Sequence, residues 1–203
     1  ATPEAVTANA ATSFAVDAAA RARAEFDGTV SVLRGEGLQV CVAADSPEPP
    51  KPDAVFPNNW VSFHEDGTVV LYPMRDPSRR RERNEALIDS VKRELGFVER
   101  RRYDLTGEER RGRFLEGTGS LVLDRARRLA YACRSPRTDE GLAREWAREM
   151  GYVPVVFDAA SPDCTPVYHT NVLLWIGERI CGCGLDWVDE TQRGMLDSTL
   201  REG

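Results

Sequence analysis

The sequence has no apolar run approaching the roughly 20 residues that a helix needs to cross a membrane, so we expect no membrane partner. The N-terminal segment, ATPEAVTANAATSF, lacks the basic start and apolar stretch of a secretory signal. The five cysteines are an odd set without the spacing of a disulfide framework. Together these absences predict a cytoplasmic protein with reduced thiols.

An excess of positive charge is also missing. The chain has 27 Lys and Arg against 33 Asp and Glu, and its formal net charge is −6. This balance argues against a nucleic-acid partner. Arginines do cluster between Arg75 and Arg113, but acidic residues are interleaved with them, as on a solvated helix face or loop. Individual arginines of this cluster could still bind the carboxylate group of a small substrate.

The length of 203 residues predicts one globular domain over residues 1–203. Hydrophobic periodicity and turn residues divide most of it into a recurring hairpin–helix–strand unit. The first copy has a hairpin over Val61–Tyr72, a helix over Glu82–Leu95 and a strand over Phe97–Leu105. The second has a hairpin over Ser120–Cys133, a helix capped by Thr138 and ended by Gly151, and a strand over Tyr152–Phe157. The third has a hairpin over Val167–Gly184 and a helix over Val188–Arg201, without a closing strand.

The residues before the first unit predict two further elements. Apolar residues at helical spacing up to Leu33 indicate a helix, which Gly35 and Gly37 end. A short strand over Leu38–Val42 follows. The sequence thus predicts an α/β fold.

Each repeated unit opens on a short polar signature. These are FPNN at residues 56–59, FLEGTG at 114–119 and VYHTN at 167–171. By subtraction, Asn58 and Glu116 are 58 residues apart, and Glu116 and His169 are 53 residues apart. Repeats of one supersecondary unit around an axis bring equivalent positions together at the centre. We therefore predict an α/β propeller, of which about three to four units are present, with these signatures at its centre.

Histidine is scarce, which narrows the choice of catalytic residues. Of the two histidines, His169 lies in a signature, and Glu116 lies in another with glycines after it, where backbone can approach a ligand closely. A lone histidine or loop carboxylate is often only structural, but the pair in matching positions favours a site. His64 adjoins an Asp66-Gly67 dipeptide suited to a type I′ hairpin turn, so we expect it to be exposed and structural.

The cysteines do not form a recognisable metal or redox motif. Cys181 and Cys183 lack the two-residue gap of common zinc sites, and no second pair completes four ligands. We expect both, and Cys133, to be thiols packed in the core. A zinc site made of His169, Cys164, Cys181 and Cys183 is a less favoured alternative, and we predict no metal and no cofactor.

Four segments resemble a known family. They are FPNNWVSFHEDGTVVLYPM (Phe56–Met74), FLEGTGSLVLDR (Phe114–Arg125), YACRSPRTDE (Tyr131–Glu140) and YHTNV (Tyr168–Val172). In composition, order and spacing they are similar to the citrulline-utilisation hydrolase branch of the amidinotransferase and arginine deiminase superfamily. That resemblance implies the pentein fold, in which five ββαβ units form a propeller around a substrate channel.

The resemblance also implies roles for individual residues. In the family a cysteine thiolate attacks the central carbon of the guanidino or related group. Glu116 matches the glutamate that holds the planar nitrogen cluster, and His169 matches the histidine that donates a proton to the departing nitrogen. Arg137, and within an arginine run Arg80, match positions that bind the substrate's α-carboxylate.

Three departures from the deiminases refine this expectation. Asn58-Asn59 replaces an arginine–aspartate pair, and Asn171 replaces an aspartate. Asparagine carries no charge and offers both a donor and an acceptor, which suits a neutral ureido group better than a cationic guanidinium. None of the five cysteines matches the nucleophile's context. The resemblance therefore implies a chain truncated at both ends, with the nucleophilic cysteine outside it.

These observations predict a C–N hydrolase that acts on the ureido or guanidino group of a citrulline- or arginine-like amino acid. The alternatives left open are an amidinotransferase that uses an amine acceptor, and a catalytically inactive binding remnant of the fold. We expect a small amino-acid substrate, and the sequence leaves a homo-oligomer open.

Overall fold

The computed structural model describes the backbone of residues 3–46 and 48–202, and the side chains of residues 18, 20–46 and 48–202. It divides into two compact units. The first comprises the residues up to Ala44 together with Leu87–Phe97, and the second comprises Asp45–Ala86 together with the residues from Val98 on. Among the described residues, no helix combines the length and the apolar character needed to cross a membrane.

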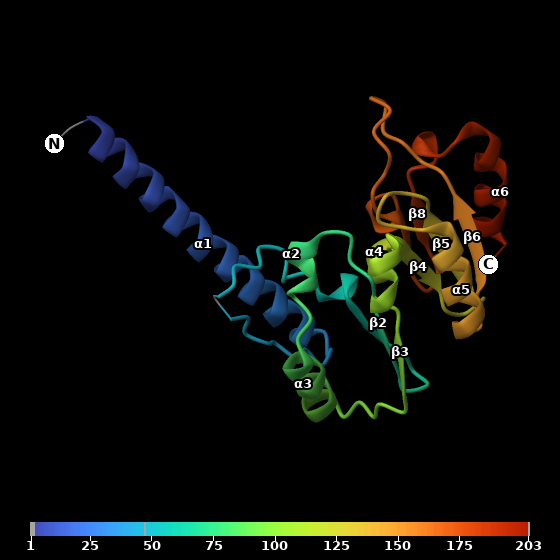
Figure 1. Ribbon diagram of the computed structural model, residues 1–203, viewed down its shortest axis with the longest axis horizontal. Helices are drawn as coiled ribbons and strands as arrows, with labels where there is room; N and C mark the ends of the chain where they lie inside the picture. The colour runs from blue at the N-terminus through green and yellow to red at the C-terminus, as the bar shows by residue number, and fades with distance from the viewer. Residues whose placement is uncertain (1–2, 47, 203) are drawn as a thin grey trace. The chain divides into compact units, whose positions relative to one another are not determined.

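The first unit is mainly helical. Helix α1 runs from Pro3 to Gly35 and is much longer than the predicted helix, although it ends where the glycines predicted, with Gly37 in the left-handed region at φ +82° (Figure 1). The predicted strand Leu38–Val42 is wrong, because these residues are irregular and pair with no described strand. Helix α3 runs from Glu85 to Leu95. It starts later than predicted because the Asn84 side chain accepts the Ala86 N–H and so caps it.

The second unit contains two sheets with the same connectivity. In the first, β1 (Val61–Phe63) pairs antiparallel with β2 (Thr68–Leu71), which pairs parallel with β3 (Arg101–Asp104) (Figure 1). In the second, β4 (Leu121–Asp124) pairs antiparallel with β5 (Leu129–Cys133), which pairs parallel with β6 (Val153–Phe157). The chain passes through α3 between β2 and β3, and through α5 (Glu140–Met150) between β5 and β6. The recurring ββαβ unit is therefore confirmed.

A third hairpin, β7 (Leu174–Ile176) with β8 (Cys181–Cys183), is followed by helix α6 (Glu190–Arg201). Among the short helices, α2 (Pro77–Arg80) lies between β2 and α3 in the sequence, η2 (Thr106–Arg111) follows β3, and η4 (Leu185–Trp187) precedes α6. The α/β class is confirmed, whereas closure into a propeller and the number of units stay predictions.

Strand β5 has both faces buried, and its alternating side chains join two hydrophobic clusters. Ala130 and Ala132 face a cluster that includes Trp146 of α5, whereas Tyr131 and Cys133 belong to a cluster that includes Leu196 of α6. This alternation is the two-residue period of a strand. One face of the second sheet therefore packs against α5, and the other face packs against the third hairpin and α6.

Helix α5 begins one residue later than predicted. The N-cap is Asp139, whose Oδ1 accepts the Leu142 N–H at 2.7 Å, and Gly151 ends the helix as predicted, at φ +71°. The Thr138 hydroxyl is not free to cap because it donates to the Ser120 hydroxyl at 2.8 Å.

Three single-turn helices precede the three hairpins. They are η1 (Pro57–Asn59), α4 (Gly117–Ser120) and η3 (Thr170–Val172). Helix α4 contacts both η1 and η3. The three polar signatures predicted to converge therefore do so, around α4.

His64 is buried rather than exposed, which corrects the sequence prediction. It is 6% exposed, its Nε2 lies 2.8 Å from Ser62 Oγ, and Ser62 Oγ lies 2.7 Å from the Tyr72 hydroxyl. The turn after it is not type I′, since Gly67 alone has a positive φ and Asp66 instead accepts the Thr68 N–H. Burial lowers the pKa of His64 from 6.5 to about 4, with a further contribution from the charge of a nearby arginine.

This burial makes stability depend on pH. Because the folded-state pKa of His64 is below its unfolded value, its contribution is present above pH 6.5 and is lost as the pH falls towards 4. We expect a loss on the order of 2–3 kcal/mol over that window, which His64→Gln removes. Denaturant unfolding at several pH values, with NMR titration of the two histidines, tests this. A His64 titration near pH 6.5 would contradict it.

Candidate active site

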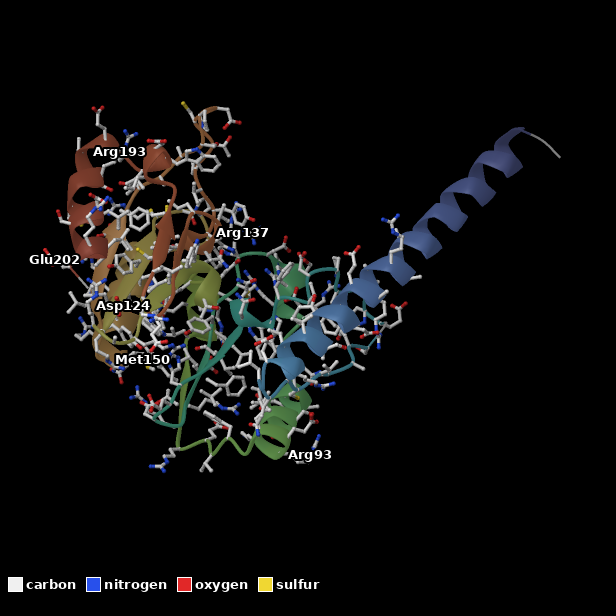
Figure 2. All side chains as sticks on the ribbon, turned by 180° about the vertical axis from the view of Figure 1, so that it is seen from behind. Arg93, Asp124, Arg137, Met150, Arg193 and Glu202 are labelled. Carbon is white, nitrogen blue, oxygen red and sulfur yellow. The ribbon has the colours of Figure 1, made fainter. Side chains whose placement is uncertain are left out.

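Glu116 is the centre of the site. Its side chain is fully buried, and its two carboxylate oxygens receive three hydrogen bonds. The Arg75 N–H donates to Oε1 at 3.0 Å, Arg137 Nη1 donates to Oε2 at 3.0 Å, and His169 Nε2 lies 2.8 Å from Oε2. An ionised carboxylate can only accept, so the proton of this last bond belongs to His169 Nε2. Figure 2 labels Arg137 within the second unit.

The ionised form of Glu116 is favoured despite its burial. Burial by itself raises the pKa of a carboxyl group, but the hydrogen bonds from His169 and the Arg75 N–H, with the charge of Arg137, outweigh it and hold the pKa of Glu116 below 4.5. The site therefore contains a negative charge on Glu116. Two side chains with planar groups, the guanidinium of Arg137 and the imidazole of His169, bind this charge through their N–H groups.

Steric constraints explain why the FLEGTG signature has glycine at positions 117 and 119. Gly117 has φ +47°, and a Cβ there would lie 2.1 Å from the Asn58 carbonyl oxygen. A Cβ at Gly119 would lie 2.4 Å from Asn59 Nδ2 and 2.8 Å from His169 Nδ1. Glycine at these two positions therefore allows the first and third signatures to approach the second.

A buried hydroxyl joins the backbones of the site. Ser120 Oγ accepts the Glu116 N–H at 2.9 Å and donates to the Arg137 carbonyl at 2.9 Å. The Arg137 carbonyl can only accept, so the single hydroxyl hydrogen of Ser120 is used in that bond. Ser120 Oγ therefore accepts the hydrogen bond from the Thr138 hydroxyl. The Thr170 hydroxyl, next to His169, donates to the Ser120 carbonyl at 2.6 Å. Ser120 thus ties together the segments that carry all three charged or ionisable groups.

The two asparagines of the first signature reach the same region. Asn58 Nδ2 donates to the Thr118 hydroxyl at 3.2 Å, and Asn59 Nδ2 donates to the Glu116 carbonyl at 3.3 Å. Asn59 Oδ1 accepts from Arg79 Nη1 at 3.0 Å. Arg79 is only 5% exposed, but it could not be singled out from the sequence because nothing in the arginine run distinguishes it from its neighbours.

Two predicted residues lie apart from these contacts. Asn171 is exposed, and no hydrogen bond of its side chain joins it to the described part of the chain. Arg80 donates to the Met74 carbonyl at 2.9 Å and pairs with Glu109 at 3.2 Å. Their roles in substrate binding stay predictions.

The cysteines do not join the site. Cys133 is fully buried as predicted, and burial raises the pKa of its thiol to about 11. Burial likewise raises the pKa of half-buried Cys183 to about 11, whereas Cys181 is exposed, so its predicted place in the core is wrong. None of the described cysteines hydrogen-bonds to Glu116 or His169, and the described residues contain no cluster of three metal-binding side chains.

Solved structures share the fold. The substrate-bound N-terminal domain of ArgZ, an arginine dihydrolase from the ornithine–ammonia cycle in cyanobacteria, matches with a TM-score of 0.67 and 18% identity. The match covers 90% of this chain and 62% of that one. A complex of AgrE with L-arginine also gives a TM-score of 0.67 at 18% identity, over 90% of this chain and 25% of that one. The chain thus spans less than two thirds of these relatives, and at this identity they establish only the fold.

The fold is that of the penteins, α/β proteins built from ββαβ units. The family model described as N,N dimethylarginine dimethylhydrolase, eukaryotic, matches residues 5–203, and the chain belongs to that family. No curated protein sequence matches the chain. The narrower likeness to the citrulline-utilisation branch stays a prediction.

Two glycine substitutions test the packing of the site. Gly119→Ala forces a methyl group against Asn59 and His169, and we expect it to destabilise the fold by about 1–3 kcal/mol and to displace the His169 ring. Gly194→Ala in α6 meets open space, so we expect it to stabilise by about 0.5–1 kcal/mol. Denaturant unfolding measures the change in stability of each variant, and the NMR signals of His169 report the displacement of its ring. Equal effects of the two substitutions would contradict this packing.

The lowered pKa of Glu116 gives a second test. A carboxyl group with a depressed folded-state pKa contributes stability above its unfolded pKa, near 4.5, and loses it as the pH falls through the folded value. We expect Glu116→Gln to abolish that part of the acid dependence, whereas Glu149→Gln, on the exposed surface, leaves it intact. Unfolding curves between pH 5 and pH 2 would refute the assignment if both variants kept the wild-type slope.

Proposed function

We propose that this chain provides most of the active site of a C–N hydrolase that acts on the ureido or guanidino group of a citrulline- or arginine-like amino acid. The observation that supports this is the buried Glu116 carboxylate, which contacts both His169 and Arg137. In this proposal the reaction passes through a covalent cysteine intermediate, and the nucleophilic cysteine lies outside the residues of this chain.

Glu116 is proposed to hold the planar nitrogen group of the substrate. A carboxylate can accept two N–H bonds from a ureido or guanidinium group. In the structure its Oε2 already accepts a guanidinium N–H, that of Arg137. We propose that the substrate replaces this guanidinium, which then becomes free to pair with the substrate's α-carboxylate.

His169 is proposed as the proton donor and acceptor. Its Nε2 carries a proton towards Glu116, so a substrate nitrogen bound at the same carboxylate would lie within reach of this imidazole. In the proposed reaction the cysteine thiolate attacks the central carbon, and the departing nitrogen takes its proton from His169. The imidazole then removes a proton from the water that hydrolyses the intermediate.

The asparagines are proposed to select a neutral group. Asn58 and Asn59 border Glu116 without adding charge, and Asn171 follows His169 in the chain. A citrulline-like ureido group offers donors and an acceptor to such amides, whereas a guanidinium offers donors alone. Arg80 keeps its predicted carboxylate-binding role in this proposal, and Arg79 joins it as a candidate, because it contacts Asn59 directly.

The closed propeller is part of the same proposal. Helix α4 contacts η1 and η3, which is the arrangement expected where successive units meet at a common axis. We also propose a cytoplasmic location and a single domain over residues 1–203.

Ligand binding tests the proposal. We expect calorimetric titration of the 203-residue chain to show L-citrulline binding more tightly than L-arginine. We expect Glu116→Gln to weaken citrulline binding at least about tenfold, the cost of one charge-assisted hydrogen bond, and the surface control Glu149→Gln to leave it unchanged. Clear preference for arginine would contradict the role of the asparagines, and equal effects of the two substitutions would contradict the role of Glu116.

An activity assay tests where the nucleophile lies. We expect the 203-residue chain alone to release no ammonia from citrulline, because none of its described cysteines hydrogen-bonds to Glu116 or His169. Ammonia release that is lost on Glu116→Gln would show that this chain contains its own nucleophile and would overturn that part of the proposal.

A further inference from the structure

A polar cavity lies in the arginine-rich segment, and of the residues proposed for the active site only Arg80 lines it. Its volume is about 260 Å³, and it lies between α2 and the segment that follows it on one side and η2 on the other. The cavity is lined by Arg80, Arg83, Thr106, Gly107, Glu109 and Arg110.

Positive charge exceeds negative charge in this cavity. Three guanidinium groups face one carboxylate, that of Glu109. Glu109 Oε2 pairs with Arg80 at 3.2 Å, and its Oε1 pairs with Arg83 and also accepts the Met74 N–H at 2.9 Å. One carboxylate is therefore divided among three donors, and two positive charges remain without an opposite charge.

Two of the guanidinium groups retain unused hydrogen-bond donors. The Nε–H of Arg83 is buried and has no acceptor among the residues that the structure describes. Arg110 is exposed, and the described part of the chain gives its side chain no hydrogen-bond or ion-pair partner. A buried donor without an acceptor is costly, and a bound anion that accepts the Arg83 Nε–H would remove that cost.

We propose that Arg80, Arg83 and Arg110 form a binding site for a small multivalent oxyanion, of the phosphate or dicarboxylate class. Planar guanidinium groups match the paired oxygens of such ions, and each pair of N–H groups can bind two oxygens of one anion. Thr106, whose side chain carries a hydroxyl donor, also lines the cavity.

The site is linked to Glu116 by a short path of hydrogen bonds. Glu109 holds the Met74 N–H, and the N–H of the next residue, Arg75, donates to Glu116 Oε1. Arg80 also donates to the carbonyls of Met74 and Arg75. An anion that draws Arg80 away from Glu109 therefore acts on the same short segment that holds the Glu116 carboxylate.

Titration with inorganic phosphate and, separately, with succinate tests this site. At constant ionic strength, we expect one of the two ions to bind saturably and to shift the backbone amide signals of Thr106, Gly107 and Arg75. Binding of phosphate identifies a phosphate site, and binding of succinate identifies a carboxylate site. Shifts that follow ionic strength alone, with neither ion saturating, would overturn the proposal.

Two neighbouring arginines provide a matched pair of variants. Arg110→Gln removes a guanidinium that lines the cavity, and we expect it to weaken anion binding at least about tenfold. Arg111→Gln makes the same change of charge one residue on, where the guanidinium pairs with Glu108 on the surface, and we expect no more than a twofold effect. Equal weakening by both variants would show that the anion only senses net charge, which contradicts a defined site.

Competition with L-citrulline separates this site from the proposed active site. Arg80 is common to both proposals, whereas Arg83 and Arg110 belong to the anion site alone. We expect saturating citrulline to weaken anion binding by no more than about tenfold, the cost of one charge-assisted hydrogen bond, because Glu116, His169 and Arg137 lie outside this cavity. Complete displacement of the anion by citrulline would make the cavity a part of the substrate site and would overturn the proposal. If citrulline fails to bind at all, the proposed function fails, while the anion titration still decides this site.

Discussion

The structure of the site depends on one buried carboxylate. A charge removed from water is strongly destabilising unless fixed donors surround it, and Glu116 has three, from Arg75, Arg137 and His169. Each donor comes from a different part of the chain, so the carboxylate is satisfied only when these parts meet. The same three bonds that make its burial tolerable also hold in place the carboxylate that we propose as the substrate contact.

Much of the surrounding structure serves this meeting. Gly117 and Gly119 lack the side chains that would keep the first and third signatures away from the second, and the Ser120 hydroxyl joins the backbones of Glu116 and Arg137. The second sheet, buried on both faces, gives these short helices a rigid support. A site built from irregular turns is thus held by regular elements that carry none of its chemistry.

The sequence predicted the elements whose signals are local. Alternation and turn residues located both hairpins of the complete units, and the glycine after α5 marked its end, because these patterns depend on neighbouring residues. It also predicted that Glu116 and His169 would meet, from their equivalent places in a repeat. It failed for His64, since a histidine at a hairpin tip looks exposed until Trp146 of the next ββαβ repeat packs beside it. Arg79 was missed for the same reason, because its burial comes from long-range contacts.

A crystal structure of the 203-residue chain with L-citrulline would test the central claim most directly. We predict that the ureido nitrogens lie within hydrogen-bonding distance of the Glu116 carboxylate, beside His169, and that the Arg137 guanidinium has left Oε2 to pair with the citrulline carboxylate. Citrulline bound elsewhere, or absent at saturating concentration while Arg137 still occupies Glu116, would contradict it.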